Sequence, residues 1–305
     1  GLGTKTGSKQ YRALNKDGTF NVRKTHLNWV DKLNVFHALI SMSWLKFIGL
    51  ILLGYFTVNT LFASLYLVIG IEHLTGIPQT GLSEFERFLE AFFFSAQTVT
   101  TLGYGRVAPV GTVANIIAAT ESMLGLLGFA LATGLLYGRF SRPSSKLKFS
   151  THAVVAPYQD INGFMFRVVN PRKNQLLEVE AQVSVSFNKK NTDQREFHAL
   201  ELERSSVMFF PSVWTIVHPI DEKSPLNHFT EKDVLDRDAE FIVAIKMFDE
   251  SFAQTVYSRT SYKADEIKWG QKFTYIIERD PNGIRVNVNA LDHTETKALN
   301  ISKED

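Results

Sequence analysis

Residues 84–106 read EFERFLEAFFFSAQTVTTLGYGR, and this stretch decides how the rest of the chain is interpreted. Ser83 and Glu86 have the spacing of a capping box, which predicts a helix over about 84–99. Such a helix is too short to cross a bilayer. The glycine-containing segment TLGYG follows at 101–105. We therefore predict a pore helix that enters a membrane and a chain that then turns back.

Two long apolar runs flank this stretch. The first is FIGLILLGYFTVNTLFASLYLVIGI at 47–71, and the second is VANIIAATESMLGLLGFALATGLLYG at 113–138. Each is long enough to cross a hydrocarbon core of roughly 30 Å. Within a transmembrane domain over 43–143, we predict an outer helix over about 44–71 and an inner helix over about 112–140. Buried helices of a large soluble protein are the alternative.

Basic residues are distributed unevenly around these runs. Lysine and arginine near the ends of a span favour the cytoplasmic side. The connecting segment holds only Arg87 and Arg106, whereas the outer flanks hold Lys5, Lys9, Arg12, Lys16, Arg23, Lys24, Lys32, Arg139, Arg142, Lys146 and Lys148. We therefore predict a multi-pass membrane protein with both termini in the cytoplasm.

A second amphipathic segment precedes the first span. Apolar residues in 28–42 recur at spacings of four, three and four, and they are Trp29, Leu33, Phe36 and Ile40. This spacing places them on one face of a helix. We interpret 28–42 as an interfacial helix on the inner leaflet, after a cytoplasmic segment over 1–27. The alternative is a soluble helix that packs on the cytoplasmic domain.

The TLGYG segment is expected to line a pore. Irregular backbone at membrane depth is tolerated only where protein buries it or where it lines a water-filled cavity. Successive carbonyls can form the oxygen cage of a dehydrated K⁺, and Gly103 and Gly105 permit the backbone angles that this requires. We predict K⁺ ligands at the carbonyls of Thr101, Leu102, Gly103 and Tyr104 and at the Thr101 hydroxyl. The Tyr104 ring is expected to point away and to pack on pore-helix aromatic residues.

The oligomeric state follows from the same geometry. One chain supplies only one wall of an oxygen cage. Four copies are needed to close a ring, so we predict a homotetramer.

After residue 143 the sequence pattern changes to a period of two. Residues 177–187 alternate without error between apolar and polar side chains, and residues 284–290 alternate as well. Both patterns predict strands. We predict that 144–305 form a cytoplasmic all-β sandwich of immunoglobulin-like architecture.

Turn and terminal segments complete this interpretation. Turn signals occur at Asn162-Gly163 and at Pro281-Asn282-Gly283, between short apolar runs. The first 20 residues and those after about Lys297 are polar, and we expect them to be mobile.

Several classes of function are disfavoured by composition. The chain has no cysteine and a formal net charge of +2, so it contains no disulfide and no strong basic signature of a nucleic-acid partner. Its eight histidines form no HExxH motif, and no phosphate-cradling glycine loop is present. We therefore predict that the protein is not an enzyme and uses no cofactor, with K⁺ as the permeant ion.

From about Lys24 to Trp269, the sequence resembles the prokaryotic inward-rectifier potassium channels. Besides the filter stretch, the resemblance is carried by ESMLGLLGFALATGLLYGRFSRP at 121–143, FRVVNPRKNQLLEVEAQV at 166–183, WTIVHPIDEKSPL at 214–226 and KADEIKWG at 263–270. It implies a two-helix pore domain and a cytoplasmic immunoglobulin-like sandwich, in the inner cell membrane of a prokaryote. It also implies gating by motion of the inner helix.

The resemblance implies roles for matched positions. Gly125 and Gly134 match glycines of the inner helix, with Gly134 as the bending point, and Tyr137 matches the residue that closes the bundle crossing. Glu178 matches an acidic residue of the cytoplasmic pore, although its position fits the solvent-exposed face of a β-strand equally well. Anionic lipid head groups are implied as partners of Arg139, Arg142 and Lys146, which are also ordinary positive-inside anchors.

Departures from the family pattern bear on block and gating. Phe129 stands in the cavity where strongly rectifying members have a carboxylate, which puts strong block by Mg²⁺ or polyamines in doubt, whereas Ba²⁺ block is expected. Glu121 lies nearer the filter and is expected to face the cavity or to support the filter from behind. Gln97 replaces a pore-helix glutamate of the family. Whether phosphoinositide activates or inhibits the channel is left open.

Two other functions remain compatible with the sequence. The first is a membrane-anchored ligand-binding or sensory β-sandwich, in which the spans serve only as a tether. The second is a less selective cation channel, because Leu102 stands where valine or isoleucine is more usual in TxGYG.

Overall fold

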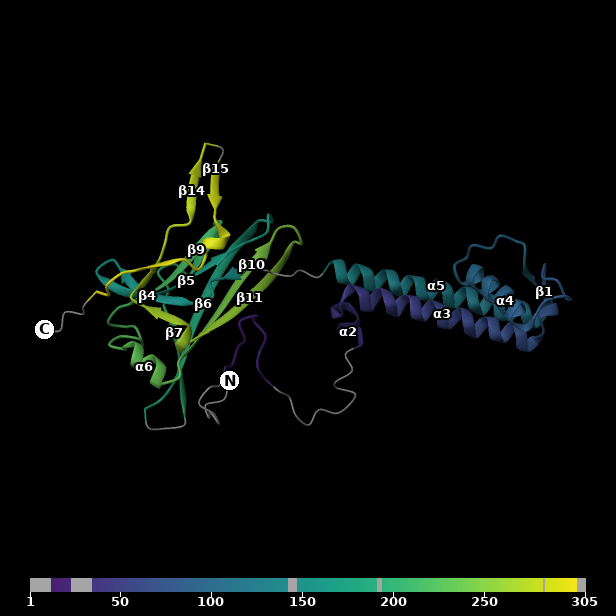
Figure 1. Ribbon diagram of the computed structural model, residues 1–305, viewed down its shortest axis with the longest axis horizontal. Coiled ribbons are helices and arrows are strands. Elements are labelled where there is room, and N and C mark those ends of the chain that lie inside the picture. Colours follow the sequence, from purple (N-terminus) through teal and green to yellow (C-terminus); the bar gives the residue numbers. More distant parts are fainter. Residues whose placement is uncertain (1–11, 23–34, 142–146, 191–193, 282, 301–305) are drawn as a thin grey trace. The chain divides into compact units, whose positions relative to one another are not determined.

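The computed structural model describes residues 12–22, 35–141, 147–190, 194–281 and 283–300. The chain divides into two compact units (Figure 1). One unit is His26–Arg142, and the other combines Gly1–Thr25 with Pro143–Asp305. The N-terminal segment therefore belongs to the same unit as the C-terminal half.

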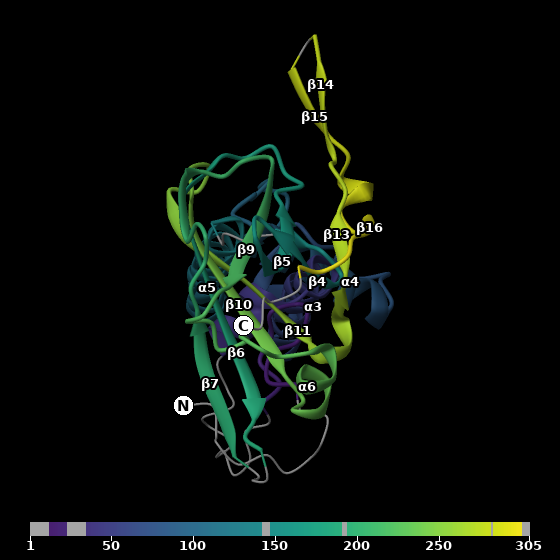
Figure 2. The same cartoon turned by 90° about the vertical axis from the view of Figure 1, so that its left-hand side faces the viewer.

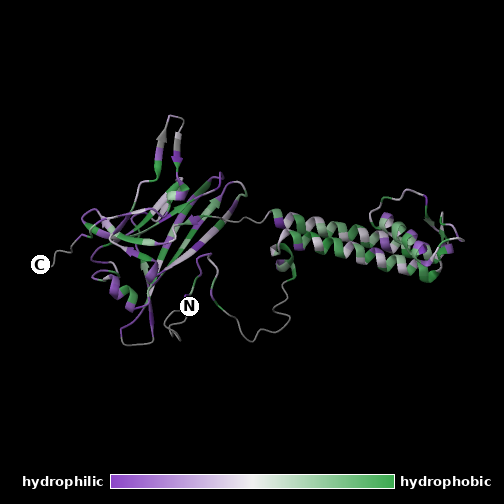
Figure 3. Cartoon of the chain, in the orientation of Figure 1, coloured by the Kyte–Doolittle hydropathy of each residue, from purple (hydrophilic) through white to green (hydrophobic). Residues whose placement is uncertain are grey.

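The first unit is helical, and two of its helices are long and apolar enough to cross a membrane. Figure 3 shows that hydrophobic residues cover these two helices along most of their length. In chain order the elements are α2 (Val35–Ser41), α3 (Trp44–Ile69), η1 (Ile71–His73), β1 (Leu74–Thr75), α4 (Glu84–Val99), β2 (Ala108–Pro109) and α5 (Thr112–Phe140).

These bounds agree with the predicted outer, pore and inner helices to within two residues. Helix α3 ends at Ile69 because Gly70 adopts a φ of +104°, which leaves the helical region. Of the segment predicted as an interfacial helix, Val35–Ser41 form helix α2, and residues 28–34 lie outside the described residues. Phe36 and Ile40 both lie next to Gly138 of α5, so they share a face as their spacing predicts.

The core of the helical unit lies where α3, α4 and the segment before α4 meet. Phe62, Ala63 and Tyr66 of α3 pack with Ala91 and Phe94 of α4. The rings of Tyr66 and Phe94 meet edge to face, with centroids 5.2 Å apart. The pore helix is thus held against the outer helix by a compact apolar cluster.

The second unit is a β-sandwich of two five-stranded sheets, with the main core between them (Figure 2). Its elements are β3 (Lys148–Phe149), β4 (Ala153–Tyr158), β5 (Ile161–Val169), β6 (Leu176–Asn188), β7 (Arg195–Leu200), β8 (Ser206–Phe209), β9 (Val213–Ile220), α6 (Glu231–Asp236), β10 (Glu240–Asp249), β11 (Gln254–Lys263), η2 (Ala264–Glu266), β12 (Ile267–Trp269), β13 (Gln271–Phe273), β14 (Ile277–Asp280), β15 (Gly283–Val286), η3 (Val288–Ala290) and β16 (Thr294–Thr296).

One sheet has the order β11-β10-β6-β7, with β8 also paired to β6. The other has the order β12-β4-β5-β3, with β9 also paired to β5, and only β12 and β4 run parallel among its pairs. Hairpin β14–β15 extends away from the sandwich in both views (Figures 1 and 2). The predicted all-β sandwich is therefore confirmed.

The alternating residues of β6 behave as predicted. Val179, Ala181, Val183 and Val185 are buried in the main core, whereas Glu178 and its polar neighbours at 180 and 182 are exposed. A period of two sends successive side chains to opposite faces, so one face of β6 meets the second sheet and the other meets solvent.

Two local predictions are corrected by the structure. Asn162 and Gly163 lie inside β5, and the turn before β5 is formed instead at residues 159–160. The strand expected over 284–290 ends at Val286, and residues 288–290 form a 3₁₀ turn. Turn signals and alternation are local, so neighbouring strands decide their final register.

The expected mobility of both terminal regions is also wrong for their described parts. Ala13 and Leu14 are buried, with exposed fractions of 4% and 1%. At the other end, Asn300 exchanges hydrogen bonds with Asn162 and donates to the carbonyls at 159 and 161. Polar composition alone suggested mobility, but specific partners far away in sequence order these segments.

Candidate functional site

The pore helix α4 begins with the predicted capping box. The Ser83 hydroxyl accepts from the Glu86 backbone N–H at 3.3 Å, and the Glu86 carboxylate accepts from the Ser83 N–H at 2.8 Å. At the other end the Leu102 N–H donates to the Gln97 carbonyl at 2.8 Å. The backbone of TLGYG is therefore attached directly to the last turn of the helix.

The TLGYG backbone has an alternating conformation. Thr101, Gly103 and Gly105 have φ values of +57°, +52° and +82°, whereas Leu102 and Tyr104 are not in the left-handed region. Threonine rarely adopts positive φ, so its conformation is imposed by the surrounding structure. Alternation of this kind can turn successive carbonyls to the same side of the chain, as a row of cation ligands requires.

The segment after TLGYG is held by a second set of contacts. Arg106 forms an ion pair with Glu90 of α4, and its guanidinium lies 3.5 Å from the Gly76 carbonyl. The Val110 N–H donates to the His73 carbonyl at 2.8 Å, next to the β1–β2 pairing. Both ends of the segment are thus fixed to the scaffold.

A buried polar network joins helices α3, α4 and α5. The Tyr66 hydroxyl donates to the Glu121 carboxylate at 2.7 Å. The Ser95 hydroxyl lies between that carboxylate and the Asn59 side-chain oxygen, 3.0 Å from the latter. Asn59, Ser95 and Glu121 are fully buried, and such a network in an apolar surrounding fixes the relative positions of its members.

Glu121 is buried within this network. Its carboxylate is enclosed between α3, α4 and α5 in the single chain, which favours the filter-backing alternative over a side chain that faces the cavity. Sequence analysis singled out Glu121 but not its partners Asn59, Tyr66 and Ser95. Polar residues inside apolar spans are the available signal, because they need partners there.

The predicted gate and hinge residues of α5 differ in their surroundings. A Cβ atom added to Gly125 would lie 2.3 Å from the Val99 carbonyl oxygen, so this glycine permits close contact between α5 and the end of the pore helix. A Cβ added to Gly134 would meet no described atom within 4 Å. Phe129 and Tyr137 are about three-quarters exposed in the single chain.

Arg139 is engaged with its own chain. Its guanidinium donates to the Leu39 and Met42 carbonyls at the end of α2, both at 2.7 Å. It also lies 4.6 Å from the Trp44 ring centroid and 4.5 Å from that of Phe47. The described contacts therefore tie α2 to α3 and α5 through this one side chain.

The remaining predicted residues are not gathered at one site. Glu178 is exposed on β6 and has a φ of +47°, at an irregularity of the strand. Arg142 and Lys146 lie outside the described residues. The Tyr104 ring is exposed in the single chain and takes part in no aromatic pair among its described residues.

Comparison with known proteins is consistent with this arrangement. The family model described as "Inward rectifier potassium channel C-terminal domain" matches residues 147–304, and the model described as "Ion channel" matches residues 50–142.

Within the described residues, no group of three or more histidine or acidic side chains is arranged to hold a metal ion.

The curated relatives cover almost the whole chain. It is 35% identical to the inward rectifier potassium channel Kirbac3.1 of Paramagnetospirillum magnetotacticum, over 93% of this chain and 95% of that protein. It is 28% identical to the mouse G protein-activated inward rectifier potassium channel 2, over 99% and 76%. It is 26% identical to the human ATP-sensitive inward rectifier potassium channel 12, over 93% and 70%.

Proposed function

This chain belongs to the inward rectifier potassium channel family, and we propose that four copies of it form a pore in which the TLGYG segment selects K⁺. The K⁺ ligands are the carbonyls of Thr101, Leu102, Gly103 and Tyr104, with the Thr101 hydroxyl. The single observation that carries this proposal is the alternating left-handed backbone at 101, 103 and 105, directly after a pore helix. The chain is an ion channel and not an enzyme.

A fourfold assembly is supported by the residues that remain exposed in a single chain. Residues 101–106 are exposed, and so are most apolar side chains of α3 and α5. Unpaired carbonyls at membrane depth are costly unless water or a cation meets them. Four TLGYG segments around one axis place their carbonyls on a shared K⁺ path, and the neighbouring chains cover the Tyr104 ring.

Gating is assigned to α5. Gly134 is the bending point, because a helix bends most easily at glycine and no described atom of the single chain lies within 4 Å of a Cβ atom placed there. Tyr137, one turn further, forms the constriction at the inner bundle crossing. Gly125 instead holds α5 against the pore helix. Phe129 lines the cavity and offers no carboxylate to Mg²⁺ or polyamines.

We assign roles to charged residues on the cytoplasmic side from their positions and charges. Glu178 projects from the exposed face of β6 and contributes negative charge to the cytoplasmic part of the ion path. Arg142 and Lys146 follow α5 in sequence and bind anionic head groups of the inner leaflet. Arg139 is a positioning residue, because its guanidinium already binds α2. Both termini lie in the cytoplasm, in keeping with the positive-inside rule.

The test is uptake of K⁺ or Rb⁺ into liposomes that contain the purified full-length protein. We expect uptake that Ba²⁺ blocks and that excess Na⁺ does not compete away. Gly103→Asp should abolish it while tetramers still form. Equal uptake of Na⁺ would instead favour the less selective channel, which Leu102 leaves open.

A tethered sensory sandwich predicts a different outcome. Its purified form would be a monomer in detergent and would conduct no ion at any content of anionic lipid. Selective flux that survives Gly103→Asp would refute the assignment of the filter.

A further inference from the structure

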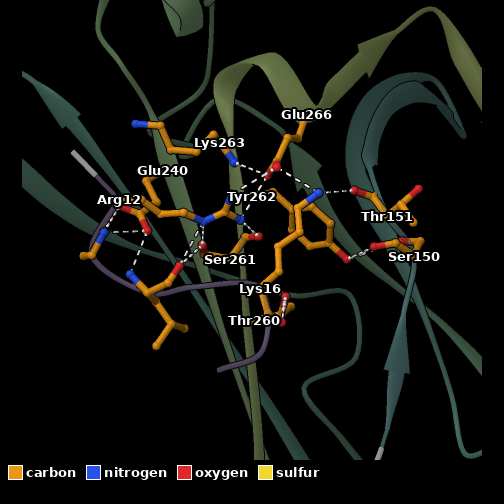
Figure 4. Close-up of polar contacts among 12 residues, drawn as sticks. Arg12, Lys16, Ser150, Thr151, Glu240, Thr260, Ser261, Tyr262, Lys263 and Glu266 are labelled. Atoms are coloured by element: carbon orange, nitrogen blue, oxygen red, sulfur yellow. Dashed lines mark hydrogen bonds and ion pairs between the residues drawn. The ribbon is translucent and has the colours of Figure 1, made fainter. Parts of the chain in front are cut away.

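Residues 12–22 form an N-terminal arm that lies across strands β10 and β11 of the β-sandwich unit (Figures 1 and 4). The arm folds back on itself, because Leu14 pairs with Phe20 and Gly18 adopts a φ of +82° in the turn. This turn fits closely against β11: a Cβ atom added to Gly18 would lie 2.8 Å from the Arg259 carbonyl oxygen. The arm therefore has a defined shape and a defined seat.

The centre of this seat is a buried carboxylate. Glu240 is fully buried, and both of its oxygens accept from the Ala13 N–H, at 3.0 and 2.9 Å. One of them also accepts from the Leu14 N–H at 3.1 Å. A buried charge is tolerated only when hydrogen-bonded. Here the backbone of the arm supplies these donors, so the carboxylate and the arm depend on each other.

A second carboxylate recognises the side chain that begins the arm (Figure 4). The Arg12 guanidinium donates to both oxygens of Glu266, at 3.0 and 3.1 Å, and to the Ser261 carbonyl at 2.6 Å. Lys16 adds an ion pair to Glu266 at 2.8 Å and donates to the Thr151 carbonyl at 3.0 Å. Only the planar fork of arginine can make the paired contact, so the seat discriminates arginine from lysine at its first position.

We propose that Glu240, Ser261 and Glu266 form a peptide-docking site whose ligand is the arm of this chain, recognised as an arginine followed by two free backbone amides. The arm is a separable ligand of this site, since its described polar contacts with the sandwich are hydrogen bonds and ion pairs that each involve a side chain, and it continues no strand of either sheet.

Trypsin cleavage of the intact chain gives the first test, because the bond after Arg12 is buried in the seat. Cleavage there should be slow in the wild-type protein. It should become at least about 10-fold faster in Glu240→Gln, since each lost hydrogen bond to a charge weakens docking about 10- to 100-fold. Glu250→Gln, which changes an exposed acid of the same unit, should leave the rate unchanged. Equal rates in all three proteins would overturn the proposal.

The second test supplies the arm as a separate molecule. A labelled, acetylated peptide of residues 12–22 is titrated by fluorescence anisotropy into the full-length chain and into a chain that lacks residues 1–22. We expect saturable binding to the shortened chain and at least about 10-fold weaker binding to the full-length chain, whose seat holds its own arm.

Two matched peptides examine the recognition itself. N-methylation at Ala13 removes the N–H that donates to both Glu240 oxygens. Arg12→Lys removes the planar guanidinium that donates to both Glu266 oxygens. Each should weaken binding about 10-fold or more. Equal binding of all three peptides, or no binding to a shortened chain that remains folded, would refute the docking site. If the shortened chain does not fold, the trypsin rates decide. Neither test depends on ion conduction, so the docking site can fail while the proposed channel function stands.

Discussion

Replacement of Gly125 by alanine is expected to disturb the contact between α5 and the pore helix. The added Cβ would lie 2.3 Å from the Val99 carbonyl oxygen and 2.9 Å from its Cα, whereas ordinary contacts begin at 3.4 Å. The two helices must therefore separate by about 1 Å at this point. Overpacking of this kind costs about 1 to 3 kcal/mol. Val99 is the last residue of α4, so the displacement also reaches the start of the TLGYG segment.

Gly128→Ala is the matched control, because it makes the same change three residues further along the same helix. A Cβ at Gly128 would meet no described atom within 4 Å. Alanine is favoured over glycine in a helix by up to about 1 kcal/mol, so this variant should be as stable as the wild type or slightly more so. The assay is the fraction of tetramer that survives heating in detergent, together with K⁺ uptake into liposomes. Equal stability and uptake for Gly125→Ala and Gly128→Ala would refute the reasoning.

Arg106→Gln should reduce K⁺ selectivity with a stability loss of about 1 kcal/mol or less, because its ion pair with Glu90 is partly exposed; the charge-reversed double variant should recover selectivity, and failure to do so would argue against the pair. Tyr66→Phe removes the hydrogen bond to the buried carboxylate of α5 and should cost about 1 to 2 kcal/mol of tetramer stability, whereas an unchanged melting temperature would contradict the network. Burial, aided by the nearby charge of a lysine at 268, lowers the pKa of His152. The unfolded chain therefore binds this proton more readily, so stability should be full above about pH 6.5 and should fall as the pH drops below it. His152→Phe should flatten this fall, and replacement of the exposed His293 should not.

The pore region could be predicted closely because its signals are local. The cap at Ser83 and Glu86, the length of the apolar runs and the glycine spacing of TLGYG each depend on neighbours within a few residues. Hydrogen bonds of a helix form within the helix, so the bounds of α4 and α5 follow from the sequence. The unusual backbone conformation of TLGYG was anticipated at Gly103 and Gly105, but the positive φ of Thr101 was not.

Partners far apart in sequence could not be predicted. Tyr66 and Glu121 are 55 residues apart, and Ala13 and Glu240 are 227 residues apart. A buried carboxylate needs donors, but its composition does not say which donors will reach it. The same limit explains why the arm was expected to be mobile, although its charges at Arg12 and Lys16 are bound by one glutamate.

The sequence by itself determined the two long apolar helices, the short helix between them, the TLGYG segment and the all-β second half, because periodicity and hydrophobic length act along the chain. Only the tertiary structure decided that Glu121 binds Tyr66 and Ser95, that Gly125 is a contact glycine and that Arg139 binds α2. These roles depend on which surfaces meet. That choice is made by packing, in which a shift of one residue or of 1 Å changes every partner.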